Sequence, residues 1–176
     1  MVEYFNNLRE EEKVELLDAL PLITVMIAGA DGSFDQEELD WADKITHIRS
    51  YKLKKEMKAF YEEVDANFIE KVQYFIEAMP ADVSQRNEII SDRLGKLNPI
   101  LAKLDTSIAY KMYRGFLSFA EHIAKASGGI MGFSSVNAAE AKLIHLPMLH
   151  PIIYIKPRGR RISFISTKIV TNISCI

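Results

Sequence analysis

The sequence predicts an all-α fold, a compact multi-helix bundle that is followed by a basic, isoleucine-rich C-terminal tail. Apolar residues recur at spacings of three and four through most of residues 10–150, which is typical of helices with one buried face. Prolines, glycines and helix-capping residues interrupt this pattern, and no convincing strand precedes residue 150. A chain of 176 residues with 48% hydrophobic side chains is long enough to bury a single core.

The first helix is expected to start in an acidic turn at Glu10 and to carry apolar residues at helical spacing up to Leu20. Pro21 fits best in the first turn of a second, buried helix, because a proline there gives up no helical hydrogen bond. Gly29 and Gly32 are expected to end that second helix.

The next helix is predicted to begin at Asp35, since Asp35 and Glu38 have the spacing of a capping box. A long helical pattern then runs over residues 52–79, with a break near Asp65-Ala66-Asn67 and a stop at Pro80.

Three more helices are predicted in the second half of the domain. One spans about residues 83–97 with Ile89 and Ile90 facing inward, and Asn98-Pro99 interrupts the chain after it. A long helix follows over about residues 106–125. A glycine-rich loop precedes the last helix, at about residues 137–146.

Charge divides the chain into two regions, residues 1–150 and 151–176. The 22 basic and 24 acidic residues are unevenly distributed: the last 26 residues hold five basic residues and no acidic one, which leaves 17 basic and 24 acidic residues before them. The tail could form a β-hairpin arm that packs on the helices, remain disordered, or be foreign to the natural domain, as after a shifted reading frame. A basic tail could also contact a membrane surface.

Several classes of function find no support in the sequence. A net charge of -2 gives no reason to expect nucleic-acid binding, and the single cysteine, Cys175, excludes a disulfide framework. The glycines at 128, 129 and 132 lack the lysine of a phosphate-binding loop. No signal peptide is seen, and the longest early uncharged stretch has only 12 residues, so a cytoplasmic protein is expected. No catalytic set of residues is found, so enzymatic activity is not expected.

Two loops of the chain resemble each other. The stretch Ser33-Phe34-Asp35-x-x-Glu38 matches Ser135-Val136-Asn137-x-x-Glu140 in residue type, and each follows a helix and a glycine. The sequence therefore predicts two pseudo-repeated units, each made of a helix, a glycine loop and a capped helix.

The signature Ala30-Asp31-Gly32-x-Phe34-Asp35-x-Glu37-Glu38, with Ala126-Ser127-Gly128-Gly129-x-x-Gly132 and Glu140 later, resembles the TerB-like tellurite-resistance family. A related domain occurs in a membrane-anchored J-domain co-chaperone. The resemblance covers roughly residues 10–148. It implies a helical bundle, a link to tellurite resistance and stress responses, and acidic loop residues that bind a metal ion. Ser127 stands where a second acidic loop would have an aspartate.

The carboxylates of the first loop have the right chemistry for a hard cation, namely calcium, magnesium or manganese. The loop is not an EF-hand, because aligning Asp31 and Gly32 with its fifth and sixth positions places Ile27 and Gly29 where the first ligands belong. Two interpretations stay open: helix capping alone, or capping plus a divalent site. The residues of that site would be Asp31, Asp35, Glu38 and Glu140.

The leading hypothesis is a non-enzymatic, TerB-like interaction or stress-response module that binds a divalent cation through its acidic loop. An enzyme that uses the loop to hold a metal-bound water is one alternative. A membrane-peripheral scaffold that acts through residues 151–176 is the other.

Overall fold

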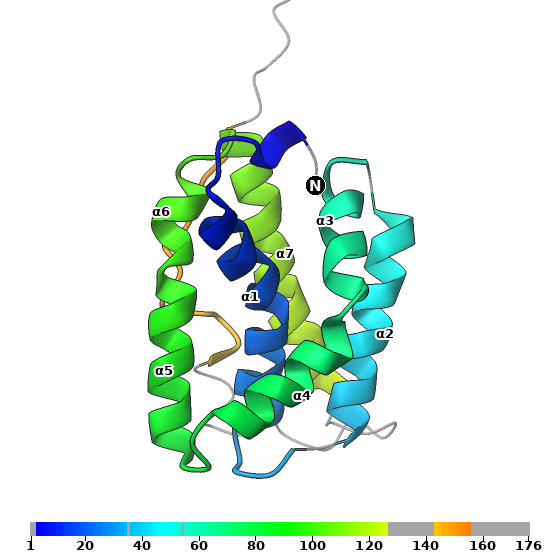
Figure 1. Ribbon diagram of the computed structural model, residues 1–176, viewed down its shortest axis with the longest axis vertical. Coiled ribbons are helices and arrows are strands. Elements are labelled where there is room, and N and C mark those ends of the chain that lie inside the picture. Colours follow the sequence, from blue (N-terminus) through cyan, green and yellow to red (C-terminus); the bar gives the residue numbers. More distant parts are fainter. Residues whose placement is uncertain (1–2, 35, 54, 127–142, 156–176) are drawn as a thin grey trace, which may run out of the picture.

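The computed structural model describes residues 3–34, 36–53, 55–126 and 143–155, and within these residues it contains helices and no strand (Figure 1). The predicted all-α class is therefore confirmed for the described part of the chain. The elements, in order, are the 3-10 helix η1 (Glu3–Phe5) and the α-helices α1 (Glu10–Ala28), α2 (Gln36–Lys52), α3 (Lys55–Asp65), α4 (Phe68–Ala78), α5 (Val83–Gly95), α6 (Leu97–Leu101) and α7 (Thr106–Ala126).

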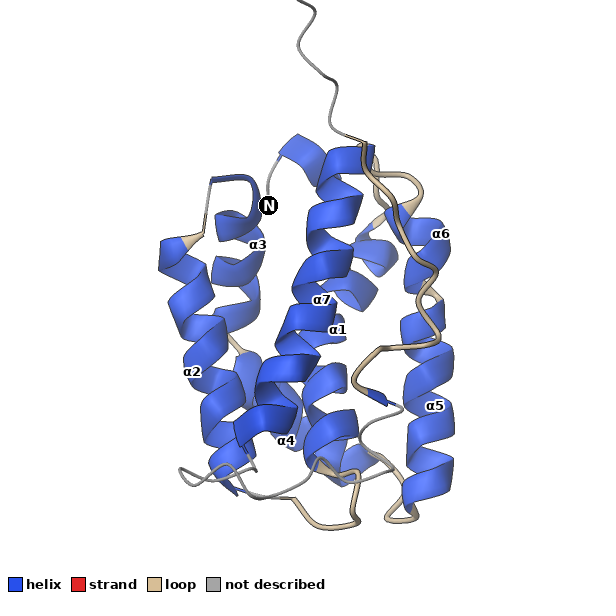
Figure 2. Ribbon diagram, turned by 180° about the vertical axis from the view of Figure 1, so that it is seen from behind, coloured by secondary structure: helices blue, strands red, loops and turns tan. Residues whose placement is uncertain are grey.

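Helix α1 is the centre of the bundle and contacts each of the other six α-helices. Figure 1 shows it between α5 and α6 on one side and α2 and α3 on the other, while Figure 2, from behind, shows α7 crossing over it. Every residue from Asp18 to Ala28 is buried. Because other helices surround it, the second half of α1 is apolar on all faces and does not have a single apolar stripe.

Pro21 lies inside α1, and the predicted start of a separate helix at this residue is wrong. A proline in a helix interior removes one backbone hydrogen bond and costs about 3 kcal/mol relative to alanine. The burial of the ten residues from Ala19 to Ala28 offsets that cost, because packing on all sides stabilises the helix on either side of the proline. The predicted stop at Gly29 is confirmed, since α1 ends at Ala28.

The helix breaks near Asn67 and Pro80 are confirmed, and the break expected at Asn98-Pro99 occurs slightly earlier, at Lys96 between α5 and α6. Pro99 lies in the first turn of α6, where its missing N–H would have had no partner within the helix. Ile89 was expected to face inward and is 42% exposed, because the buried row of α5 runs through Arg86, Ile90 and Leu94.

The predicted helix over residues 106–125 is confirmed as α7, which buries its apolar face against α1 and α2. All six of the residues expected in its core are buried: Ile108, Ala109, Met112, Phe116, Phe119 and Ile123.

After a helical residue at Leu143, residues 144–155 run back along α5, α6 and α7 as a chain without helix (Figure 2). Leu146 and Leu149 are buried in the core, and Ile152 packs against it. Leu146 has a φ of 44°, an uncommon conformation for a leucine that its complete burial maintains.

The second glycine loop and most of both the predicted last helix and the tail lie in residues 127–142 and 156–176, outside the described residues, whereas residues 151–155 of the tail are described and form no strand. The first repeated unit is present as α1, its glycine loop and α2. The second unit, the conformation of the tail and the domain boundary at residue 150 therefore remain predictions.

Candidate functional site

The loop between α1 and α2, described from Gly29 to Phe34, is the first place to test the predicted site. Its backbone turns back on itself, with the N–H of Gly32 donating to the carbonyl of Gly29 over 3.1 Å. Gly32 has a φ of 94°, which a residue with a side chain rarely adopts. The turn predicted at Asp31-Gly32 is therefore present, and its backbone conformation requires a glycine at residue 32.

The side chain of Arg86 on α5 contacts this loop and fixes its position. Its guanidinium donates hydrogen bonds to the carbonyl oxygens of Gly29 and Ala81, and it lies 5.0 Å from the centre of the Phe34 ring. Arg86 is only 2% exposed, and this burial lowers its pKa while the charge of Asp82 opposes the change. A buried cation therefore fixes the shape of the acidic loop.

Asp31 is exposed at the turn, and its carboxylate is oriented by Ser33. Its Oδ1 accepts hydrogen bonds from the backbone N–H and the hydroxyl of Ser33, each over 2.9 Å. These bonds stabilise the charged form, so they lower the pKa of Asp31 and keep it ionised at neutral pH.

The same arrangement occurs at the start of α7, where Asp105 accepts from the N–H and hydroxyl of Ser107 over 2.8 and 2.6 Å. There it begins a helix and its pKa is lowered in the same way. The hydrogen bonds at Asp31 are thus those of an aspartate turn, and a cation is not needed to explain them.

Of the four predicted metal ligands, the structure describes two. Asp31 is exposed in the loop, and Glu38 is 3% exposed in the first turn of α2. Asp35 and Glu140 lie outside the described residues. Within the described ranges, no three histidine, cysteine, aspartate or glutamate side chains are arranged to hold a metal ion. A site that joins Asp31 and Glu38 to Asp35 and Glu140 remains a prediction.

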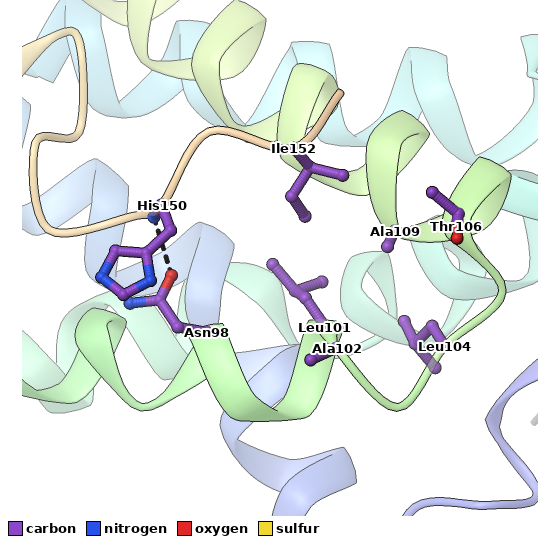
Figure 3. A pocket seen from close by; sticks show the side chains of 8 residues that line it. All are labelled: Asn98, Leu101, Ala102, Leu104, Thr106, Ala109, His150 and Ile152. Atoms are coloured by element: carbon purple, nitrogen blue, oxygen red, sulfur yellow. Dashed lines mark hydrogen bonds between the residues drawn. The ribbon is translucent and has the colours of Figure 1, made fainter. Parts of the chain in front are cut away.

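An apolar pocket of about 250 Å³ lies between α6, the start of α7 and the returning chain (Figure 3). Asn98 fastens that chain: its Oδ1 accepts from the His150 N–H over 2.8 Å, and its Nδ2 donates to the Met148 carbonyl over 2.9 Å. In Figure 3 Ile152 projects towards Leu101 across the pocket. The pocket is smaller than most ligand sites, and its contacts explain how the chain is anchored.

A larger groove of about 580 Å³, here called the basic groove, lies where α2, α3 and α7 meet. It is lined by Arg49, Leu53, Glu56, Met57, Tyr61, Tyr110, Lys111, Arg114, Gly115 and Ser118. The sequence reasoning did not find it, because its residues come from three helices that are far apart along the chain. The one local signal was the spacing of Tyr110, Lys111 and Arg114, which places basic and aromatic side chains on neighbouring parts of one helix.

Comparison with protein families, with curated proteins and with solved structures finds no match to this chain. The family resemblance therefore rests on the loop residues alone. In the part of the chain that the structure describes, no helix combines the length and the apolar character that crossing a bilayer requires.

Proposed function

We propose that this chain is a non-enzymatic, TerB-like interaction module whose acidic loop binds a divalent cation. The clamp of Arg86 on the loop is the observation that supports this proposal most. Burying a guanidinium against backbone carbonyls is costly. A loop whose shape is held by such a group is suited to presenting a fixed binding surface.

The chemistry of the loop fits a hard cation. Asp31 supplies an ionised, exposed carboxylate whose second oxygen, Oδ2, is outside the turn's hydrogen bonds. Glu38 supplies a second carboxylate, buried at the start of the next helix. Carboxylates of this kind bind calcium, magnesium and manganese, and Asp35 and Glu140 would complete the set.

Isothermal titration of the full chain with calcium, magnesium and manganese tests the proposal. We expect saturable binding of one of these ions by the wild type and a loss of at least about tenfold in affinity in Asp31→Asn, which keeps the shape of the side chain and removes its charge. Asp105→Asn is the matched control, because it changes the same turn at a place where no ion is expected. It should bind as the wild type does.

Two results would contradict the cation site: no saturable binding of any of the three ions, or equal weakening by Asp31→Asn and Asp105→Asn. The second result would mean that the loss follows from disturbing an aspartate turn. Glu38→Gln is a further variant, and its circular dichroism and thermal unfolding must first match those of the wild type, because Glu38 is buried.

A further inference from the structure

The basic groove contains a cation whose charge no described carboxylate neutralises. Arg49 of α2 donates to the Tyr61 hydroxyl over 2.8 Å, the Gly115 carbonyl over 3.0 Å and the Ser118 hydroxyl over 3.1 Å. All three acceptors are neutral. Burial raises the pKa of Tyr61, so its hydroxyl stays protonated and offers no negative charge to Arg49.

Several other cations of the chain are paired with carboxylates. Arg93 contacts Glu15 and Asp18 over 3.1 and 3.0 Å, and Lys103 contacts Glu12 over 2.5 Å. In the basic groove, Lys111 is paired with Glu56. Arg49 differs from these, and resembles Arg86 at the acidic loop, in having neutral acceptors but no carboxylate counter-ion among the described residues.

The position of Arg49 is fixed before any ligand arrives. Three hydrogen bonds hold its guanidinium, and the rings of Tyr61 and Phe119 each lie with their centres 5.5 Å away. A guanidinium has five N–H donors, so two remain after these three bonds. A preorganised cation with donors to spare is a strong partner for a carboxylate or phosphate.

The rest of the basic groove combines a second cation with apolar walls. Arg114 is exposed on α7 and forms no ion pair with a described residue. Leu53 is 37% exposed, and Met57 and the ring of Tyr110 line the same space. Three cations and one carboxylate thus line a mainly apolar groove, whose volume is within the range of small-molecule sites.

We propose that the basic groove binds a small amphipathic organic anion, whose carboxylate pairs with Arg49 and whose apolar chain lies against Leu53 and Met57. We choose an anionic ligand because its negative charge complements the cations that line the groove. The chain's own tail is a poor occupant, because residues 156–176 contain five basic residues and no acidic one.

The basic groove is separate from the acidic loop. Gln36, at the loop end of α2, is 13 residues from Arg49, which corresponds to roughly 20 Å along the helix. The proposal therefore does not depend on the cation site, and each can fail without the other.

Titration of the full chain with decanoate, below its micelle concentration, tests the proposal. We expect saturable binding at one site, no detectable binding of decyltrimethylammonium, and much weaker binding of acetate. The comparison with decyltrimethylammonium tests the contribution of the negative head group, and the comparison with acetate tests that of the apolar chain.

Variants of the two arginines locate the site. Arg114→Gln changes an exposed residue and should weaken decanoate binding several-fold, whereas Lys125→Gln, exposed on the same helix outside the groove, should leave it unchanged. Arg49→Met keeps the apolar stem and should weaken binding by at least about tenfold, as expected for a lost hydrogen bond between charged groups.

Several outcomes would overturn the proposal. They are the absence of saturable decanoate binding, equal binding of decyltrimethylammonium, and unchanged affinity in Arg114→Gln. Binding of a glutamate-rich peptide without binding of decanoate would also overturn it and would indicate a protein partner. Arg114→Gln keeps the test valid even where Arg49→Met unfolds, because its side chain is exposed.

Discussion

At the scale of single residues, Gly29 and Arg86 determine the shape of the acidic loop together. A Cβ atom at Gly29 would lie 2.7 Å from a ring carbon of Phe34, 2.8 Å from a guanidinium nitrogen of Arg86 and 2.9 Å from the carbonyl of Val25. Such distances are too short for any carbon atom, and the backbone oxygen cannot move aside. The absence of a side chain at residue 29 is therefore a condition for the clamp.

We predict that Gly29→Ala lowers the free energy of unfolding by about 1–3 kcal/mol, the usual cost of adding a methyl group to a filled space. Urea unfolding followed by circular dichroism measures this change. Gly95→Ala is the control, since a Cβ there meets nothing within 4 Å and the residue ends a helix. It should be neutral or stabilising by up to about 1 kcal/mol. Equal effects of the two variants would contradict this account of the loop.

At the scale of elements, a single polar side chain caps the start of α5. The Oδ1 of Asp82 accepts from the N–H of Gln85 over 2.9 Å, which satisfies a donor that has no partner within the helix. The same aspartate lies near Arg86, whose pKa it raises against the effect of burial. Asp82 thus begins the helix that carries the clamp.

We predict that Asp82→Ala destabilises the protein by about 1 kcal/mol, the typical cost of losing a helix N-cap. Thermal unfolding measured by calorimetry should show the decrease. Asp92→Ala, at an exposed position within the same helix, should change stability by less than about 0.5 kcal/mol. A decrease in Asp92→Ala as large as that in Asp82→Ala would show that helix charge, and not the cap, is responsible.

Across the whole molecule, a few ion pairs join segments that are distant in sequence. Glu12, in the first turn of α1, contacts Lys103 beyond α6, and its second oxygen accepts from the N–H of Arg9 over 3.0 Å. The hydrogen bond from Lys103, followed by that from Arg9, lowers the pKa of Glu12 from 4.5 to about 2. Folding therefore favours the charged form of this carboxylate.

This shift predicts a pH dependence of stability. Because the folded protein holds the pKa of Glu12 below its unfolded value, the stabilisation is complete above about pH 4.5 and is lost as the pH falls towards 2. Glu12→Gln should therefore be less stable than the wild type at pH 7, and the difference should shrink between pH 4.5 and pH 2. Urea unfolding at a series of pH values measures it.

Glu11→Gln is the control for this prediction, because Glu11 is the neighbouring carboxylate and its side chain is 83% exposed. Its stability should follow that of the wild type across the same pH range. A difference between Glu12→Gln and the wild type that stays constant down to pH 2 would contradict the assignment of the pH dependence to Glu12.

The amphipathic helices could be predicted from the sequence because the spacing of their apolar residues shows which face is buried. Helix α7 has one apolar face and its ends agree with the prediction to within a residue. On α5, Ile89 and Ile90 are equally apolar, and the choice between them depends on where α1 lies. Periodicity gives the width of a buried face better than its exact direction.

The candidate sites also differ in how far the sequence predicted them. The acidic loop was recognised from its residues, since turn chemistry is local, but neither Arg86 nor the basic groove was. Arg86 occupies the buried row of α5, four residues before Ile90, and this spacing could have drawn attention to it. Arg49, Tyr61 and Gly115 meet only after three helices have packed.

The sequence by itself determined that the described chain is helical, where most helices begin and end, and that an acidic glycine turn follows residue 28. These properties depend on spacing, capping and turn residues, which act over a few positions. Only the tertiary structure decided that α1 continues through Pro21, that Arg86 clamps the loop and that Arg49 is held among neutral acceptors in the basic groove. Each of these depends on burial and on contacts between distant segments, and a local pattern contains neither.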